Sequence, residues 1–135
     1  MRTALLLAPL LLTGCLADLL GDAVDRTTLA CDLRDPDSIE PRDYCQEWRG
    51  VIDSPGSDTT PRALCASMGA AFHEGGCPSE GIIAGCYTGD QGDGGQNIWW
   101  FYDTTWDGQP ATLEDAEAEC EGDGEIIEYT EPEYP

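Results

Sequence analysis

Seven cysteines are the residues of this chain whose type and spacing point most directly to chemistry. Cys15 ends an apolar N-terminal segment, and the other six are spread over the rest of the chain: Cys31, Cys45, Cys65, Cys77, Cys86 and Cys120. An even number of cysteines in an exported protein is typical of a disulfide framework. We therefore predict three disulfide bonds among these six, each worth about 2–4 kcal/mol to a small domain.

The spacing of the six cysteines leaves their pairing open. Cys77 and Cys86 flank one short loop and form an attractive pair, whereas cysteines on helices could instead bridge to strands. Zinc is the alternative use, because Cys65, His73, Cys77 and Cys86 could supply three sulfurs and one nitrogen. Their spacing contains no paired Cys-x-x-Cys knuckle. We expect disulfides, no metal site and no cofactor.

The chain begins with a short export signal. An apolar run over residues 4–12 is too short to span a bilayer, since a spanning helix needs about 20 apolar residues. The run ends in Leu12-Thr13-Gly14-Cys15, which resembles the lipobox of bacterial lipoproteins. The resemblance implies a signal peptide over residues 1–14 and lipidation of Cys15. Because Leu16 rather than Asp follows, it also implies the outer membrane. The alternative is an ordinary cleaved signal with an incidental cysteine.

Aromatic side chains in the second half of the chain are the most distinctive candidates for ligand binding: Trp99, Trp100, Phe101, Tyr102 and Trp106. Successive side chains of a strand point to opposite faces, so Trp100 and Tyr102 should share one face, and Trp99 and Phe101 the other. One set should pack beneath helices. The other set either forms an exposed patch that contacts sugars or a protein, or is covered by loops or by the N-terminal tether.

No catalytic arrangement of residues is evident in the sequence. His73 is the only histidine, no Gly-x-Ser-x-Gly nucleophile elbow accompanies it, and the cysteines are expected to be oxidised. Carboxylates are so frequent that no glycosidase pair can be singled out. The segment 90–97 offers oxygen ligands, but it lacks the alternating Asp and distal Glu of an EF-hand calcium loop. We expect a flexible hairpin tip there and a protein without enzymatic activity.

The composition is strongly acidic, with 27 Asp and Glu residues against six Arg and Lys and a formal net charge of −21. Such a surface repels the phosphates of nucleic acids and anionic lipid headgroups. We therefore expect no nucleic-acid partner, and contact with a membrane only through a lipid on Cys15.

Turn residues and apolar stretches divide the rest of the chain into a tether, a domain and a tail. Residues 15–44 are interpreted as the lipidated cysteine and an acidic tether, with a short frayed helix over 16–30 and Asp- and Pro-rich turns over 32–43. Apolar and aromatic residues concentrate after Cys45, so the predicted domain covers residues 45–129. Residues 130–135 are expected to form an acidic, mobile tail.

Within the predicted domain, helix and strand signals alternate. Strands are expected over residues 45–52, 70–73, 81–88, 96–102 and 125–129, and helices over residues 60–68 and 112–121. Thr60-Pro61 and Thr112 are typical helix starts. Each helix carries a cysteine that is followed by three residues, a glycine and a short strand, which indicates a weak internal repeat. We predict a small α+β fold, in which an antiparallel sheet carries two helices on one face and is stabilised by disulfides.

The order of the cysteines and of their neighbours resembles a group of small cysteine-rich exported lipoproteins that are abundant in myxobacteria and related deltaproteobacteria. The resemblance spans about residues 45–128 and rests on Cys45-x-Glu-Trp-x-Gly, a helical Cys65, Gly69-x-x-Phe72, Gly76-Cys77-Pro78, Ala84-Gly85-Cys86, the aromatic strand, and Cys120 before Gly124. That group has no assigned activity, so the resemblance implies fold and location only.

Together these features predict a non-enzymatic, outer-membrane-anchored module of the cell envelope with a structural or interaction role. The alternative is a module that binds glycan, peptidoglycan or protein through an exposed aromatic strand. In both cases the expected partner is an envelope protein or a glycan.

Overall fold

The computed structural model describes residues 25–53, 60–90 and 94–134. The predicted signal peptide over residues 1–14, the lipidation site Cys15 and residues 16–24 of the predicted tether lie outside the described residues. Six strands and two helices make up the described part of the chain, in the order β1 (Arg26–Asp32), β2 (Tyr44–Ile52), α1 (Pro61–Ser67), β3 (Ala71–Glu74), β4 (Ile82–Asp90), β5 (Gln96–Tyr102), α2 (Leu113–Cys120) and β6 (Glu125–Ile127).

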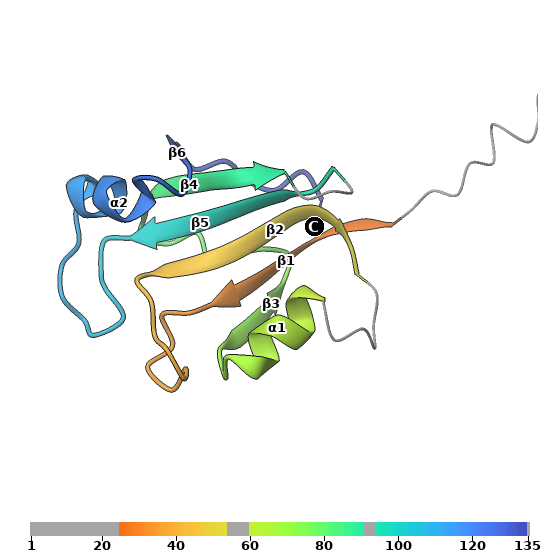
Figure 1. Ribbon diagram of the computed structural model, residues 1–135, viewed down its shortest axis with the longest axis horizontal. Coiled ribbons are helices and arrows are strands. Elements are labelled where there is room, and N and C mark those ends of the chain that lie inside the picture. Colours follow the sequence, from red (N-terminus) through yellow and green to blue (C-terminus); the bar gives the residue numbers. More distant parts are fainter. Residues whose placement is uncertain (1–24, 54–59, 91–93, 135) are drawn as a thin grey trace, which may run out of the picture.

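All six of these strands belong to one antiparallel sheet, in the order β3-β1-β2-β5-β4-β6 (Figure 1). Strands β4 and β5 form the predicted hairpin. Strand β2 contains a bulge, in which Arg49 and Gly50 together face one residue of β1, and Gly50 has a φ of 65°. The predicted α+β class is confirmed. Strands β2 and β5 occupy the centre of the sheet.

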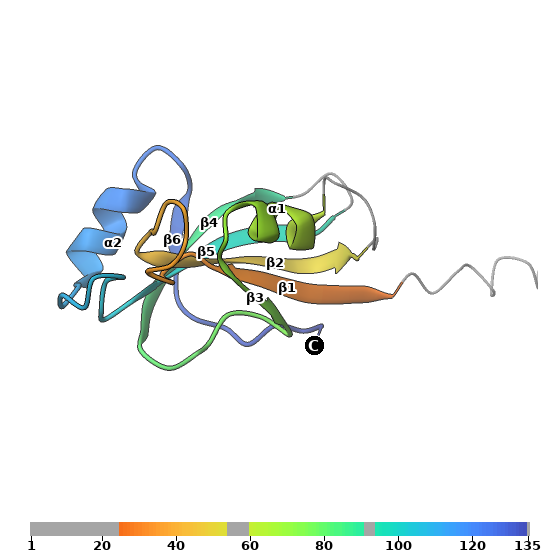
Figure 2. The same cartoon turned by 90° about the horizontal axis from the view of Figure 1, so that it is seen from below.

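Both helices pack on the same face of the sheet, as predicted, and they lie near its two edges (Figure 2). Helix α1 packs on β1 and β3, and α2 packs on β4 and β6. Each begins at a predicted cap, since the Thr60 hydroxyl accepts from the Ala63 N–H at 3.2 Å and Thr112 forms a capping box with Asp115. We call the side that carries the helices the helical face, and the other side the opposite face.

Two disulfide bonds fasten the helices to the strands beneath them. Cys31 of β1 bonds Cys65 of α1 with a Cα–Cα distance of 5.4 Å, and Cys86 of β4 bonds Cys120 of α2 with a Cα–Cα distance of 5.6 Å. Each bond closes a sequence separation of 34 residues. The alternative in which helical cysteines bridge to strands is therefore confirmed.

The third disulfide lies on the opposite face, where Cys77 bonds Cys45 of β2. The predicted number of three bonds is thus confirmed. The attractive pairing of Cys77 with Cys86 is wrong, because Cys86 points towards α2 whereas the loop that carries Cys77 crosses the other side of the sheet.

The internal repeat is larger than the sequence indicated. Segments β1-β2-α1-β3 and β4-β5-α2-β6 each contain two paired strands, a helix and an edge strand, and their sheet orders β3-β1-β2 and β6-β4-β5 correspond. In each segment a glycine, Gly69 or Gly124, follows the helical cysteine by four positions and leads into the edge strand. The domain is therefore a doubled ββαβ unit whose halves join between β2 and β5.

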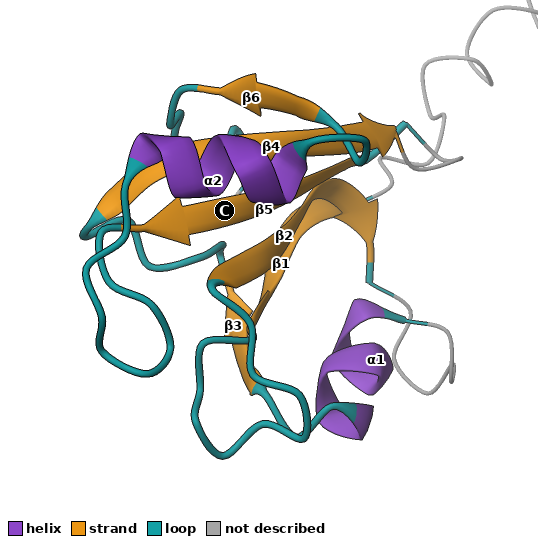
Figure 3. Cartoon of the chain, turned by 60° about the vertical axis from the view of Figure 1, so that its left-hand side comes forward, coloured by secondary structure: helices purple, strands orange, loops and turns teal. Residues whose placement is uncertain are grey.

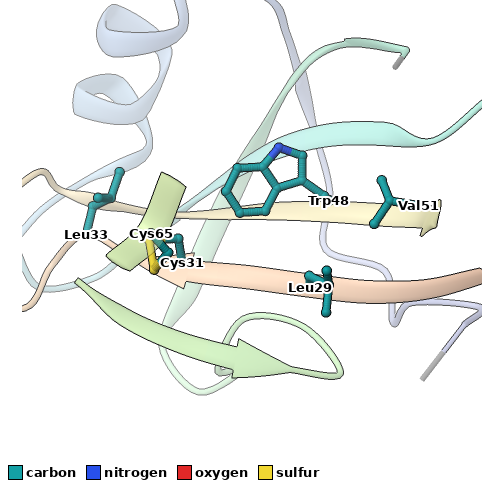
Figure 4. Close-up of a cluster of buried hydrophobic side chains, with 6 residues drawn as sticks. All are labelled: Leu29, Cys31, Leu33, Trp48, Val51 and Cys65. Carbon is teal, nitrogen blue, oxygen red and sulfur yellow. A yellow bond between two sulfur atoms is a disulfide. The ribbon is translucent and has the colours of Figure 1, made fainter. Parts of the chain in front are cut away.

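Apolar side chains fill both faces of this sheet. Beneath α1 lies a cluster of Leu29, Cys31, Leu33, Trp48, Val51 and Cys65 (Figure 4). A cluster on the opposite face contains Ala30, Cys45, Cys77, Ile98, Trp100 and Tyr102. Burying one large apolar side chain stabilises a fold by about 1.5–3 kcal/mol, so both clusters contribute substantially.

The predicted domain boundary at Cys45 is wrong, and so is the frayed helix where it overlaps β1. Strand β1 lies between β3 and β2, and its cysteine holds α1, so the folded domain includes residues from Arg26 onwards. Leu29, Ala30 and Cys31 are all buried because both sides of this strand are covered. A strand that is buried on both sides lacks the apolar–polar alternation by which strands are recognised.

The expectation of a mobile tail is also wrong for residues 130–134, which follow β6 and lie against the opposite face (Figure 2). The Tyr129 ring meets the Trp100 ring edge-on, with centroids 5.1 Å apart. Arg49 donates from Nη1 to the Thr130 hydroxyl at 2.8 Å and from Nη2 to the Thr130 carbonyl. A nearly buried guanidinium requires acceptors, and this segment supplies them.

Candidate functional site

The described cysteines are not available for chemistry, because all six form disulfides. The alternative zinc set is wrong, since Cys65, Cys77 and Cys86 each belong to a different disulfide. His73 lies on the edge strand β3, opposite Ala30 of β1. Among the residues that the structure describes, no group of three or more His, Cys, Asp or Glu side chains could hold a metal ion.

Most of the aromatic strand is core. Trp100, Phe101 and Tyr102 are 0%, 3% and 2% exposed. Strand β5 lies at the centre of the sheet, and both of its faces are covered by packed elements. These three residues therefore cannot form the exposed patch that was one of the two expectations. Phe101 packs in the cluster beneath α2, as expected for the set under the helices. The expectation of a covered set is confirmed for Trp100 and Tyr102, which the Cys77 loop and the C-terminal segment cover on the opposite face.

Tyr102 shows how tightly this strand is held. Its hydroxyl donates to the Pro78 carbonyl at 2.6 Å, and the Arg34 guanidinium lies 3.4 Å from its ring centroid. Burial raises the pKa of Tyr102, and the positive charge of Arg34 opposes that rise only in part. The phenol is therefore a neutral, structural group.

Two aromatic and two amide side chains occupy the centre of the helical face. Tyr44 and Gln46 come from β2, and Asn97 and Trp99 come from β5. The rings of Tyr44 and Trp99 stack with centroids 4.8 Å apart, and Gln46 Nε2 donates to Asn97 Oδ1 at 3.0 Å. All four side chains are only partly buried. We call these four residues the central platform.

The sheet register explains why the helices do not meet over the central platform. Cys31, Gln46, Trp99 and Cys86 form one cross-strand row. The two cysteines that hold the helices are thus three strand spacings apart, about 14 Å. Packed helices lie only about 8–10 Å apart, so helices fixed at the ends of this row are separated over its middle (Figure 3).

The central platform offers hydrogen-bonding groups beside an aromatic pair. The bond between Gln46 and Asn97 uses one N–H of Gln46 and the carbonyl oxygen of Asn97, so the Gln46 carbonyl and the Asn97 amino group can still serve a ligand. Burial raises the pKa of Tyr44, which keeps its hydroxyl protonated. Of these residues, the sequence had singled out only Trp99. The other three residues were missed because their proximity depends on the strand register. The sequence signal that could have found them is the alternation of aromatic and amide residues in the two strands.

An ion pair on the opposite face was missed altogether. Glu47, which is 1% exposed, accepts from Arg49 Nε at 2.5 Å and from the Cys77 N–H at 2.7 Å. Both side chains point to one face because they stand two positions apart in β2. Through this pair, β2 holds the Cys77 loop and the segment around Thr130, so the role of the pair is structural. The sequence signal for this pair was Glu47 and Arg49 standing two positions apart within a predicted strand.

A further candidate feature lies where β1 and β5 end. We call the loops over residues 33–43 and 103–112 the loop end of the domain. Trp106 is 42% exposed there. Its backbone N–H donates to Asp43 Oδ1 at 3.1 Å, and this bond joins the two loops. A pocket of about 290 Å³ adjoins them, lined by residues of both loops, the sheet and α2. Trp106 is thus the member of the predicted aromatic set with a well-exposed ring.

Two predictions concern residues that the structure does not describe. Cys15, the expected lipidation site, and residues 91–93 of the acidic hairpin tip lie outside the described ranges. Within those ranges, neither helix has the length and apolar character needed to cross a bilayer. Comparisons of the chain with protein-family models, with curated proteins and with solved structures gave no match.

Proposed function

We propose that this protein is an outer-membrane lipoprotein, a non-enzymatic interaction module of the cell envelope that is displayed from a lipid on Cys15. The observation that carries the proposal is Leu12-Thr13-Gly14-Cys15 at the end of a short apolar leader, with a disulfide-bonded domain beginning soon afterwards at β1.

The three disulfides support export, because such bonds form and persist in oxidising compartments. An anchor of several acyl chains suits a display role, since a single acyl chain holds a protein only marginally. The strongly acidic surface adds no attraction to anionic headgroups, so attachment depends on the lipid.

Replacing Cys15 by Ser tests the anchor. The wild-type protein should enter the detergent phase and sediment with outer membranes, whereas Cys15→Ser should enter the aqueous phase while retaining its three disulfides. Leu16→Asp tests the location, because it should move the lipidated protein to the inner membrane in a density gradient. A Cys15→Ser protein that remains equally bound to membranes would contradict the proposal.

A second candidate function is the binding of a neutral glycan at the central platform. The specific observation in its favour is the Gln46–Asn97 amide pair beside the stacked, partly exposed rings of Tyr44 and Trp99. Amide groups suit sugar hydroxyl and acetamido groups, and aromatic rings suit the apolar faces of sugars. The formal charge of −21 disfavours an anionic glycan.

Calorimetric titration with a tetramer of N-acetylglucosamine tests this second function. Asn97→Ala should weaken binding about tenfold, the effect of losing one hydrogen bond of about 1.4 kcal/mol. Trp106→Ala is the matched control, because Trp106 lies at the loop end and should leave this affinity unchanged. Equal weakening by both variants would place the glycan elsewhere, and absence of binding would remove this function.

A further inference from the structure

The pocket at the loop end has a lining of mixed character. Its apolar lining comes from the sheet and from the loop before α2, and includes Ile83, Phe101 and Pro110. Its charged lining consists of the carboxylates Asp43, Asp115 and Glu119, without any arginine or lysine. At about 290 Å³ it is at the small end of ligand pockets, which suits a single side chain better than a cofactor.

One of these carboxylates is fixed in place. Asp115 accepts from the N–H and the hydroxyl of Thr112, at 2.8 and 2.7 Å, within the capping box of α2. These hydrogen bonds lower the pKa of Asp115, so it carries its charge over the whole neutral range. A cation that enters the pocket therefore meets a preformed negative group.

The surface around the pocket is the kind that contacts proteins. Trp106 adjoins the pocket, since its neighbour Thr105 and its hydrogen-bond partner Asp43 both line it. Leu113, at 49% exposed, begins α2 directly after the loop over residues 103–112. Exposed Trp residues beside a pocket are typical centres of protein–protein binding.

The attachment of the chain leaves this end accessible. Strand β1 begins at Arg26 and leads towards the loop end, so the chain enters the domain from the other side (Figure 1). Residues 16–25 can span at most about 36 Å even when fully extended. An anchor at Cys15 therefore attaches the domain by its Arg26 side, and the loop end lies on the side away from the attachment. This step rests on the proposed function.

From these observations we infer that the pocket at the loop end receives a lysine or arginine side chain of a partner protein, with Trp106 as the neighbouring apolar contact. Lys and Arg combine an apolar stem with a charged head, and the pocket matches them with apolar walls and carboxylates. The partner is accordingly a basic envelope protein, which the net charge of −21 also attracts over longer distances.

NMR titration of the full-length protein in non-ionic detergent, at physiological ionic strength, tests the inference without a known partner. The probes are the N-acetyl N-methylamides of lysine and arginine. The norleucine analogue supplies a neutral stem of similar length, and N-acetylglucosamine represents a neutral sugar. Both cationic probes should shift the amide signals of Ala111 and Ala116 saturably, and the two neutral probes should shift these same signals with several times lower affinity.

Two variants locate the binding. Glu119→Gln and Asp43→Asn should each weaken the cationic probes roughly 2–5-fold, the worth of one exposed ion pair. The Asn side chain in Asp43→Asn retains an oxygen that can accept from the backbone N–H of Trp106, so the two loops stay joined. Glu117→Gln is the matched control, since it removes the same charge from α2 but does not line this pocket, and it should change nothing.

Several results would overturn the inference. Equal weakening by Glu117→Gln would mean general attraction to an acidic surface. Equal affinity of the norleucine analogue or of N-acetylglucosamine, measured at the Ala111 and Ala116 signals, would mean a pocket without preference for cations. Absence of saturable shifts would mean that the pocket takes no such side chain. None of these outcomes depends on the lipid, so they are distinguishable from failure of the Cys15→Ser experiment.

Discussion

Glu47 and Glu40 carry the same charge in very different surroundings. Glu47 is buried in β2 and joins Arg49, the Cys77 loop and, through Arg49, the C-terminal segment. The Glu40 side chain is 76% exposed, and the side chain of its partner Arg42 is 54% exposed. Composition alone cannot separate the two, because it counts 27 acidic residues without showing which of them are buried.

We expect Glu47→Gln to lower the free energy of unfolding by about 3–5 kcal/mol, because it leaves the guanidinium of Arg49 buried without a counter-charge. Glu40→Gln should lower it by less than about 0.5 kcal/mol, since exposed pairs contribute little. Guanidinium chloride unfolding under non-reducing conditions measures both. Equal losses would show that the Glu47–Arg49 pair does not hold the two covering segments.

Tyr102 should make the domain sensitive to alkaline pH. Burial raises the pKa of Tyr102 in the folded protein, whereas an unfolded tyrosine ionises near pH 10. The contribution of the neutral Tyr102 to the free energy of unfolding is therefore fully present below about pH 10. It is lost as the pH rises through the folded pKa, by up to about 1.4 kcal/mol per pH unit.

Tyr102→Phe cannot ionise, so its unfolding free energy should decline less steeply above pH 10 than that of the wild type. Urea unfolding at a series of pH values measures the slopes. Tyr134→Phe is the control, because Tyr134 is 37% exposed and replacing it should leave the slope as in the wild type. Parallel slopes for wild type and Tyr102→Phe would refute the assignment.

At the scale of elements, local signals predicted both helices and the central hairpin, and long-range pairing escaped prediction. The Thr60 and Thr112 caps and the glycine-rich hairpin are properties of a few adjacent residues. Strand β1 was missed because it is covered on both faces. The pairing of Cys77 was misjudged because closeness in sequence says nothing about which face of a sheet a loop crosses.

The doubled ββαβ unit predicts that its two helix-to-strand disulfides have similar worth. Each closes 34 residues, for which the chain-entropy account gives about 3–4 kcal/mol. Cys31→Ala/Cys65→Ala and Cys86→Ala/Cys120→Ala should therefore lower the free energy of unfolding by similar amounts. Denaturant unfolding of the two double variants measures this. A difference of several kcal/mol would mean that packing around α1 and α2, rather than chain entropy, sets their worth.

At the scale of the whole molecule, the sequence predicted the fold class but not how the opposite face is covered. Residues 130–135 were expected to form a mobile tail because they are acidic and contain proline, yet Arg49 donates hydrogen bonds to Thr130. The candidate sites could likewise be predicted only in part. Trp99 and Trp106 were identified as aromatic residues, whereas Gln46, Asn97 and the pocket at the loop end depend on register and loop packing.

The extent of the domain gives the most direct test of the whole fold. A chain that begins at Asp25 retains every described strand, so it should fold cooperatively with three disulfides. A chain that begins at Cys45 lacks β1. Strands β2 and β3 then lose the strand that lies between them, and Cys65 loses its disulfide partner Cys31. It should lose its near-ultraviolet circular dichroism and expose a free thiol, which thiol titration and mass spectrometry would detect. If the shorter chain instead unfolded cooperatively with native-like dichroism, the domain would begin at Cys45 and β1 would be dispensable.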